Sequence, residues 1–180
     1  MKNNIVIVNF SNRNDGNCSF IAHYLNDILN DSSVYEFGKM NVSNCGNCNY
    51  ECLNGKSCII NDDLSDLQKI LLESKEIIFV VPNYCGYPCS NYFAYNERIC
   101  GKLASNRELF TFYLNIPKRF IVVSNGDITQ FNQPFLYQIN RNEKLNFIQI
   151  KSRDYSFSST SLWSNNDDVK SKLSSYIFDK

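Results

Sequence analysis

The sequence lacks an excess of charge of either sign. Its 180 residues include 18 Lys and Arg and 18 Asp and Glu, so the formal net charge is zero. A balanced chain has no broad basic field that would attract nucleic acid. It also lacks the strongly acidic surface that many small electron carriers use for docking. We therefore expect no nucleic-acid partner.

Long apolar runs are also missing. No run approaches the roughly 18 residues that a membrane-spanning helix needs. The first residues do not show the charged-then-apolar pattern of a signal peptide, because β-branched strand residues begin at Ile5. These absences predict a cytoplasmic protein with no membrane partner.

Two common nucleotide-binding motifs do not occur. The sequence has no G-x-x-x-x-G-K-[ST], which excludes a P-loop for nucleoside triphosphates, and no G-x-G-x-x-G, which argues against a dinucleotide turn. The one histidine in the chain, His23, provides no argument for acid–base catalysis.

The most informative stretch that is present is a short apolar run, Ile5–Phe10, and the polar loop after it, Ser11–Ser19. An unbroken, β-branched run is typical of a central parallel strand that is covered on both faces. The loop supplies hydroxyls, amides, one guanidinium and one glycine. Apolar residues then recur at helical spacing from Ile21 to Leu29. A strand-to-helix loop of this kind predicts a site for an anion such as phosphate.

Apolar strand patterns alternate with helical patterns along the whole chain. The expected strands are 5–10, 34–37, 77–81, 120–123 and 147–150, and the expected helices lie at 21–29, 62–71, 89–106, 135–142 and 169–177. This alternation predicts an α/β protein with a parallel sheet and helices on both faces. We predict one domain, 1–180, with a three-layer flavodoxin-like sandwich and five parallel strands in the order 2-1-3-4-5. A cysteine-rich insertion is expected at about 41–61.

In that strand order a ligand lies beyond the carboxyl ends of the strands, where the winding reverses. Three loops should meet there: Ser11–Ser19, Pro82–Cys89 and Ser124–Asp127. The first offers donors for an anion, and the second offers Tyr84 and Tyr87, whose rings can lie against a flat ligand. An anion cradle beside aromatic walls suits a phosphorylated planar cofactor, of which FMN is the simplest choice.

The loop Ser11-Asn12-Arg13-Asn14-Asp15-Gly16-Asn17-Cys18-Ser19 resembles the S-x-R-x-x-G-N-[ST]-x loop of the NAD(P)H-dependent FMN reductase family. A second stretch is similar to the cysteine-bearing branch of that family, which includes iron–sulfur flavoproteins. It runs from Cys45-x2-Cys48-x3-Cys52-x5-Cys58 through the Asp62-Asp63 pair and a helix to Pro82-Asn83-Tyr84. The resemblance covers roughly Ile5 to Arg98 and is only fold-level beyond it.

The resemblance implies roles for three groups of residues. Ser11, Arg13, Asn17, Cys18 and Ser19 would hold the phosphate; Pro82, Asn83, Tyr84, Cys85 and Gly86 would border the isoalloxazine; Ser124, Asn125 and Gly126 would face the other edge of the ring. It also implies an enzyme that passes electrons from NAD(P)H through FMN to a quinone, a flavin or another small acceptor. Phe93 and Glu97-Arg98 stand where the family carries a Lys and an Asp-Arg pair, so substrate and dimer contacts stay open.

Two other functions remain open. One is a flavodoxin-type electron carrier, and the other is a flavin-free metal-binding or interaction module on the same fold.

The four cysteines Cys45, Cys48, Cys52 and Cys58 are spaced tightly enough to reach one centre. Four thiolates suit a [4Fe–4S] cluster or a structural zinc ion, and free thiols in a surface loop are the third possibility. The related branch usually has two residues between its second and third cysteines, whereas this chain has three.

The stretch Ser152–Ser164 is long and aromatic, with Tyr155, Phe157 and Trp163. Loops of more than about 12–15 residues tend to be functional or disordered. We expect its rings to pack against a partner subunit, in a homodimer or homotetramer.

Overall fold

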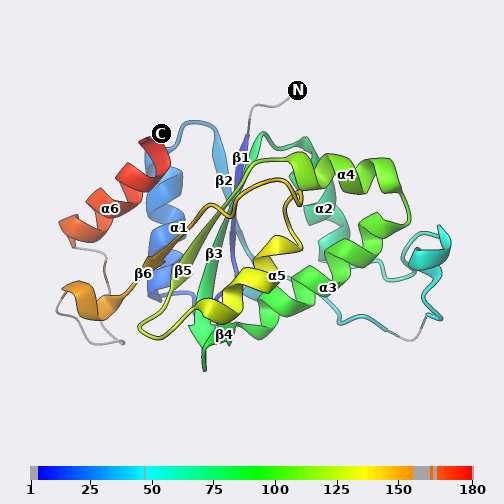
Figure 1. Ribbon diagram of the computed structural model, residues 1–180, viewed down its shortest axis with the longest axis horizontal. Coiled ribbons are helices and arrows are strands. Elements are labelled where there is room, and N and C mark those ends of the chain that lie inside the picture. Colours follow the sequence, from blue (N-terminus) through cyan, green and yellow to red (C-terminus); the bar gives the residue numbers. More distant parts are fainter. Residues whose placement is uncertain (1–3, 47, 156–162, 164–165, 180) are drawn as a thin grey trace.

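A computed structural model describes residues 4–46, 48–155, 163 and 166–179. Its centre is a sheet in the order β2-β1-β3-β5-β6, in which every neighbouring pair of strands is parallel (Figure 1). The strands are β1 Ile5–Asn9, β2 Ser32–Glu36, β3 Glu76–Tyr84, β5 Lys118–Val123 and β6 Phe147–Ile150. Counted along the parallel strands alone, this is the predicted order 2-1-3-4-5, and the prediction of a flavodoxin-like sandwich is confirmed.

Helices cover both faces of the sheet (Figure 1). One face carries α1 (Asn17–Ile28) and α6 (Asp167–Phe178), and the other carries α2 (Asp63–Glu73), α3 (Ser90–Ala104), α4 (Arg107–Asn115) and α5 (Asn132–Leu136). Short 3₁₀ turns lie at Phe37–Lys39, Glu51–Asn54, Thr129–Phe131 and Ser152–Tyr155. Within the described ranges, no helix has both the length and the apolar character needed to span a membrane.

The unbroken apolar runs of the strands feed two separate cores. Val6 and Val8 point into the core beneath α2 and α3, whereas Ile5 and Ile7 point into the core beneath α1 and α6. Successive side chains of a strand face opposite sides of the sheet. Because both sides are covered, every residue from Ile5 to Val8 is apolar, and the sequence shows no alternation there.

Aromatic rings fill the core directly beneath the predicted site. The ring of Phe10 lies 5.1 Å from that of Tyr92 and 5.3 Å from that of Tyr95, measured between centroids. Both tyrosines come from α3 and are fully buried. They therefore pack the core and do not line a slot for a ligand.

The structure corrects two expected elements and adds a third that was not expected. Pro82 does not end its strand, because β3 runs on to Tyr84 and pairs with β4 (Tyr87–Pro88) as a short antiparallel hairpin. The helix expected at 135–142 is the shorter α5, which begins earlier. Helix α4 was not predicted, although Asn106 caps it by accepting from the Leu109 N–H at 3.0 Å.

The expected role of Ser152–Ser164 is corrected in part. Trp163 is 1% exposed and packs in the core of its own chain between α1 and α6, not against a partner. Tyr155 is partly buried against the same core. Phe157 lies outside the described residues. Homo-oligomer formation stays a prediction, but these two rings do not support it.

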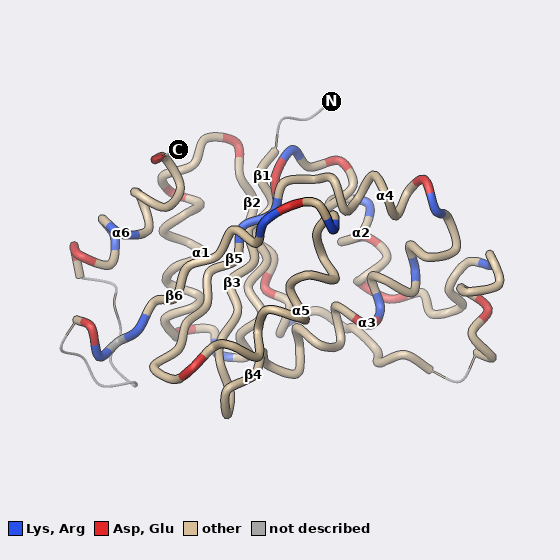
Figure 2. The backbone as a smooth tube through the Cα atoms, viewed as in Figure 1, with Lys and Arg blue, Asp and Glu red and all other residues tan. Residues whose placement is uncertain are grey.

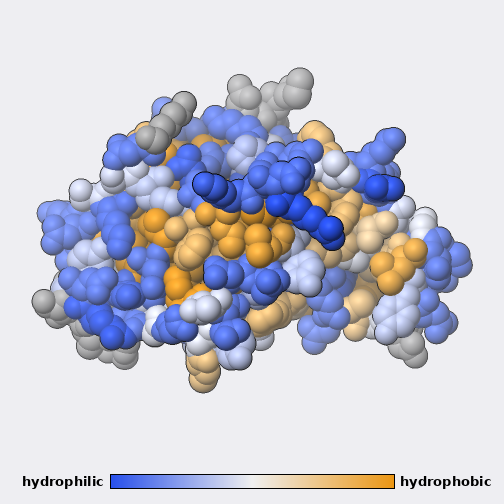
Figure 3. Space-filling view, in the orientation of Figure 1, coloured by the Kyte–Doolittle hydropathy of each residue, from blue (hydrophilic) through white to orange (hydrophobic). Residues whose placement is uncertain are grey.

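The surface matches the balanced composition. In the described part of the chain, Lys and Arg are interspersed with Asp and Glu, and the middle of the sheet carries few charges (Figure 2). Apolar side chains gather in the middle of the same face, around α5 and β6 (Figure 3).

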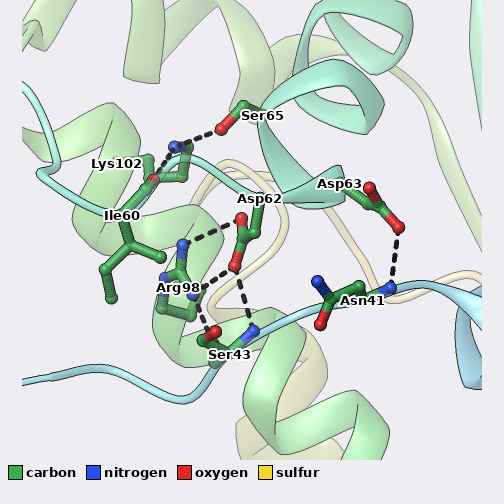
Figure 4. A network of polar contacts seen from close by, with 8 residues as sticks. All are labelled: Asn41, Ser43, Ile60, Asp62, Asp63, Ser65, Arg98 and Lys102. Carbon is green, nitrogen blue, oxygen red and sulfur yellow. Dashed lines mark hydrogen bonds and ion pairs between the residues drawn. The ribbon is translucent and has the colours of Figure 1, made fainter.

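A buried ion pair anchors the base of the cysteine-rich segment (Figure 4). Arg98 of α3 binds both oxygens of Asp62, at 2.8 and 3.1 Å, and the two side chains are 1% and 4% exposed. Asp62 also accepts from the Ser43 N–H at 3.0 Å, and Asp63 accepts from the Asn41 N–H at 2.7 Å. The two ends of the segment are thus held together on α3.

Asp62 occupies the N-cap position of α2, but its carboxylate binds Arg98 and Ser43 and makes no bond to the helix. Burial by itself would raise the pKa of the Asp62 carboxyl. The hydrogen bonds from Arg98 and from the Ser43 N–H outweigh burial, so the pKa is lowered. The ionised form therefore stabilises the fold.

We predict that Asp62→Asn destabilises the protein by about 3 kcal/mol, because it leaves the Arg98 guanidinium buried without a counter-charge. Urea denaturation measures this loss. The matched control is Asp66→Asn on the same helix, whose partner Lys69 is exposed. It should cost less than about 1 kcal/mol. Equal losses in the two variants would contradict the role of the buried pair.

The same variant tests the pH dependence. The Asp62 carboxyl has a lower pKa in the folded protein than in the unfolded chain. Its contribution to the free energy of unfolding is therefore complete above about pH 4 and is lost as the pH falls through the pKa of the folded state. Part of the acid destabilisation of the wild type should therefore be absent in Asp62→Asn.

Candidate functional site

The loop after β1 turns sharply because side chains cap its backbone. The Ser11 N–H donates to the Asn9 side chain at 3.0 Å, and the Arg13 N–H donates to the Ser11 hydroxyl at 3.0 Å. A hydroxyl that accepts one bond can still donate its own hydrogen. The loop then enters α1 at Asn17, where the first N–H groups and the positive end of the helix dipole converge.

Arg13 lies over the start of α1. A Cβ atom built on Gly16 would come within 3.3 Å of the Arg13 Cβ and 3.7 Å of its Nε. Gly16 therefore gives the Arg13 side chain room to lie across the first turn. The exposed guanidinium adds a full positive charge beside the helix N-terminus, an arrangement that suits a phosphate.

Two predicted phosphate ligands point elsewhere. Cys18 is buried in the core beneath α1, and burial raises the pKa of its thiol. The Ser19 hydroxyl donates to Glu36 at 3.1 Å, and Glu36 also accepts from Asn9 at 2.6 Å. The side chains of Cys18 and Ser19 are therefore not available to an anion, and these residues offer it only their backbone N–H groups.

Gly38 is a site residue that sequence reasoning missed. A Cβ atom on Gly38 would come within 2.7 Å of the Ser11 carbonyl oxygen and 2.9 Å of the Asn12 Oδ1. The segment after β2 thus supports the anion loop from below. Nothing in the local sequence signals this close approach, because the contact joins the segment after β2 to the loop after β1, which are far apart in the chain.

The loop after β3 is a tight hairpin. Tyr84 pairs with Tyr87, and the turn residues Cys85 and Gly86 have φ values of 54° and 88°. Two positive φ values in a two-residue turn are typical of type I′. Both tyrosines are 51% exposed, so their rings flank the hairpin and are only half covered by the protein.

Asn83 ties the loop after β3 to the loop after β5. Its Oδ1 accepts from the Gly86 N–H at 2.8 Å, and its Nδ2 donates to the Ser124 hydroxyl and to the Asp127 carbonyl. The Ser124 hydroxyl also accepts from the Gly126 N–H at 3.0 Å. One amide side chain therefore fixes the distance between two of the predicted loops.

The three loops enclose a pocket of about 390 Å³, within the range of small-molecule sites. It is lined by Asn17, Asn83, Cys85, Gly86, Val123, Ser124, Asn125, Gly126 and Trp163. Seven of these are predicted site residues. Ser11 and Arg13 stand beside the start of α1, whereas Pro82 is buried in β3 and Tyr84 projects on the hairpin.

Trp163 also belongs to the site, although the sequence pattern predicted it at a subunit interface. Its backbone N–H donates to the Asn17 side chain at 2.9 Å, which holds it at the pocket wall. Its indole Nε1 is buried and has no acceptor. A buried donor without an acceptor is rare in proteins, and here it fits a site that binds a ligand with acceptor oxygens, as FMN has.

The four cysteines of the insertion line one small hollow with Arg98. The hollow holds about 20 Å³, room for about one water molecule. Among the described residues, no three His, Cys, Asp or Glu side chains are arranged to hold a metal ion. Cys45, Cys48, Cys52 and Cys58 are neighbours around this hollow, but the arrangement of the described residues supports neither the [4Fe–4S] cluster nor the zinc ion.

Parallel strands in this order, with a pocket at their carboxyl ends, define a flavodoxin-like α/β protein. Solved structures of that fold resemble this chain over nearly its whole length. A Trp repressor binding protein from Bacillus subtilis aligns with a TM-score of 0.61 at 12% identity, covering 98% of this chain and 99% of its own.

Two further structures of the same fold are enzymes by their descriptions. An NADPH-quinone reductase from P. pentosaceus aligns with a TM-score of 0.61 at 10% identity, covering 100% of this chain and 99% of its own. An NADH:FMN oxidoreductase in its apo form aligns with a TM-score of 0.57 at 12% identity, covering 97% and 86%. No family model and no curated protein sequence matches the chain.

We predict that Gly38→Ala weakens binding of FMN, the ligand expected from the sequence, about tenfold, because overpacking of this order costs about 1–3 kcal/mol and must shift the Ser11–Asn12 backbone. Flavin fluorescence quenching measures the affinity. Gly101→Ala is the matched control, since its new Cβ would meet only Cys52 Sγ, at an ordinary 3.7 Å. Wild-type FMN affinity in Gly38→Ala would show that Gly38 does not support the ligand loop.

Proposed function

We propose that this protein is an FMN-dependent oxidoreductase that takes electrons from NAD(P)H and passes them to a quinone, a flavin or another small acceptor. The observation that carries the proposal is the pocket of about 390 Å³ that joins the loops after β1, β3 and β5. It lies at the carboxyl edge of the sheet, beside the start of α1, where Arg13 provides a positive charge. Structures of the same fold that are described as NADH:FMN oxidoreductase and NADPH-quinone reductase support it.

In this proposal the phosphate of FMN lies at the Ser11–Asn17 turn. The Ser11 hydroxyl, the Arg13 guanidinium and the first N–H groups of α1 would hold it. The Asn9 side chain contributes indirectly, because its bond to the Ser11 N–H keeps the turn closed. These groups provide position and positive potential and need no proton transfer.

The flat ring of FMN would occupy the pocket between the hairpin and the loop after β5. Asn83 sets the separation of these two walls through its bonds to Gly86 and Ser124. Gly86, at the hairpin tip, has open space around its α-carbon, so backbone can approach a ring there. When bound, the flavin supplies the hydride chemistry, and the protein supplies position and electrostatics.

The charge pattern favours an enzyme over an electron carrier. A carrier benefits from a one-signed surface that steers its protein partner, whereas the net charge here is zero and both signs are interspersed (Figure 2). The third possibility, a flavin-free module, makes no use of the pocket at this edge of the sheet.

We predict that Ser11→Ala combined with Arg13→Ala weakens FMN binding about 10- to 100-fold, because bonds to a charged group contribute about 1.5–3 kcal/mol. Riboflavin, which lacks the phosphate, should bind almost as well as it does to the wild type. Arg107→Ala, at an exposed position on α4, is the control for loss of one surface charge. Equal losses for FMN and riboflavin would mean that the phosphate lies elsewhere.

The activity itself is tested by mixing the FMN-loaded protein with NADH or NADPH without oxygen. We expect rapid two-electron bleaching of the flavin absorbance by at least one of the two. Reduction by dithionite but by neither nucleotide would favour the carrier. Failure of the wild type to bind FMN would favour the flavin-free module.

A further inference from the structure

We propose that the indole N–H of Trp163 is a hydrogen-bond donor to the phosphate group of the bound FMN. This inference rests on the function proposed above and extends it to a residue outside the loop motif.

The first observation is the state of the indole. Trp163 is 1% exposed, and its Nε1 is buried with no acceptor. An indole nitrogen is a donor only, so water or a ligand must provide the acceptor if the bond is made. Buried Trp side chains usually find such a partner. A ligand oxygen would supply the missing acceptor.

The second observation is the position of the residue. The Trp163 N–H donates to the side chain of Asn17, the first residue of α1, at 2.9 Å. Trp163 also packs in the same apolar cluster as Cys18, the next residue of that helix. It lines the pocket together with Val123 and Ser124. Trp163 therefore stands between the first turn of α1 and the loop after β5.

The third observation concerns the donors of the anion loop. The Ser19 hydroxyl, which the loop motif would direct at the phosphate, donates to Glu36 instead. Glu36 is itself a carboxylate close to the anion site, held by Asn9 and 3.2 Å from His23. A phosphate at this place would be stabilised by an additional hydrogen-bond donor. A neutral donor serves best, because it adds no buried charge that would need a counter-charge. The indole of Trp163 meets that requirement.

Phosphate is favoured over the ring as the acceptor because of where the indole lies. The other residues that line the proposed ring position come from the hairpin and the Ser124–Gly126 loop. Trp163, in contrast, is bonded through its backbone N–H to Asn17 at the start of α1. The positive end of α1 and Arg13 attract the negative group to the same place.

The test compares Trp163→Phe with the wild type for binding of FMN and of riboflavin. Phenylalanine keeps an aromatic ring in the core but removes the donor. We expect FMN to bind about 10- to 100-fold more weakly, as for a lost bond to a charged acceptor, and riboflavin to change less than about twofold. Equal weakening of both ligands, or of neither, would overturn the inference.

Tyr24→Phe is the matched control. Its hydroxyl, 2.9 Å from that of Ser174, joins α1 to α6 in the same layer but does not line the pocket. The variant loses a polar group of the layer without losing a ligand contact, so both affinities should stay at the wild-type values. A loss of FMN affinity in Tyr24→Phe as large as in Trp163→Phe would assign the effect to packing.

A second measurement needs no substitution. The chain has one tryptophan, so protein labelled with ¹⁵N-tryptophan gives a single indole signal. FMN and inorganic phosphate should each shift the indole proton downfield, and riboflavin should not. If the wild type binds FMN while this signal stays in place, the role of Trp163 is wrong and the proposed function stands. If the wild type does not bind FMN, both are wrong.

Discussion

The parallel pairing of β1 with β3 is the constraint on which the rest of the structure depends. Asn9 lies opposite Val80, and the Phe10 N–H donates to the Val80 carbonyl at 3.0 Å. This register brings the end of β1 beside the end of β3, so the anion loop and the hairpin begin at one edge. Because the winding of the sheet reverses between these strands, helices leave on opposite faces and open the space for a ligand. Apolar residues on both faces hold the pairing in register, since a slip of one residue would exchange the two cores.

Polar side chains then fix what the sheet brings together. Asn9 is fully buried and holds both the Ser11 N–H and Glu36, so the anion loop is attached to β2 as well as to β1. Asn83 likewise ties the loop after β3 to the loop after β5, through its bonds to Gly86 and Ser124. The Asp62–Arg98 pair anchors the cysteine-rich segment on α3 (Figure 4). In each case a side chain with several donors or acceptors replaces backbone pairing, which irregular loops cannot provide.

The sequence predicted most where a pattern is local. Apolar runs located the strands, and the polar loop after Phe10 located one of the loops beside the pocket. The signals failed where a distant contact decides the outcome. Pro82 reads as a strand end, yet the hairpin pairing of Asn83 with Pro88 carries the strand beyond it.

Two residues of the first loop show the same limit. Cys18 and Ser19 read as phosphate ligands, yet the Cys18 side chain lies in the core and the Ser19 hydroxyl donates to Glu36. Trp163 reads as an interface residue, because nothing near it in the chain shows that Asn17 and the α1–α6 core receive it.

The sequence by itself determined the α/β class, the order of the parallel strands and the set of loops that meet at the carboxyl edge. The class follows from apolar periodicity and from the handedness of crossover connections, which act over neighbouring residues. The strand order and the meeting of the loops follow from the flavodoxin-like pattern that five alternating strands fit. Only the tertiary structure decided which side chains of those loops face the pocket, that Gly38 supports the anion loop, and that the indole of Trp163 closes the wall. Those outcomes depend on contacts between residues far apart in the chain, such as the bond from Trp163 to Asn17. A local sequence pattern does not predict such a contact.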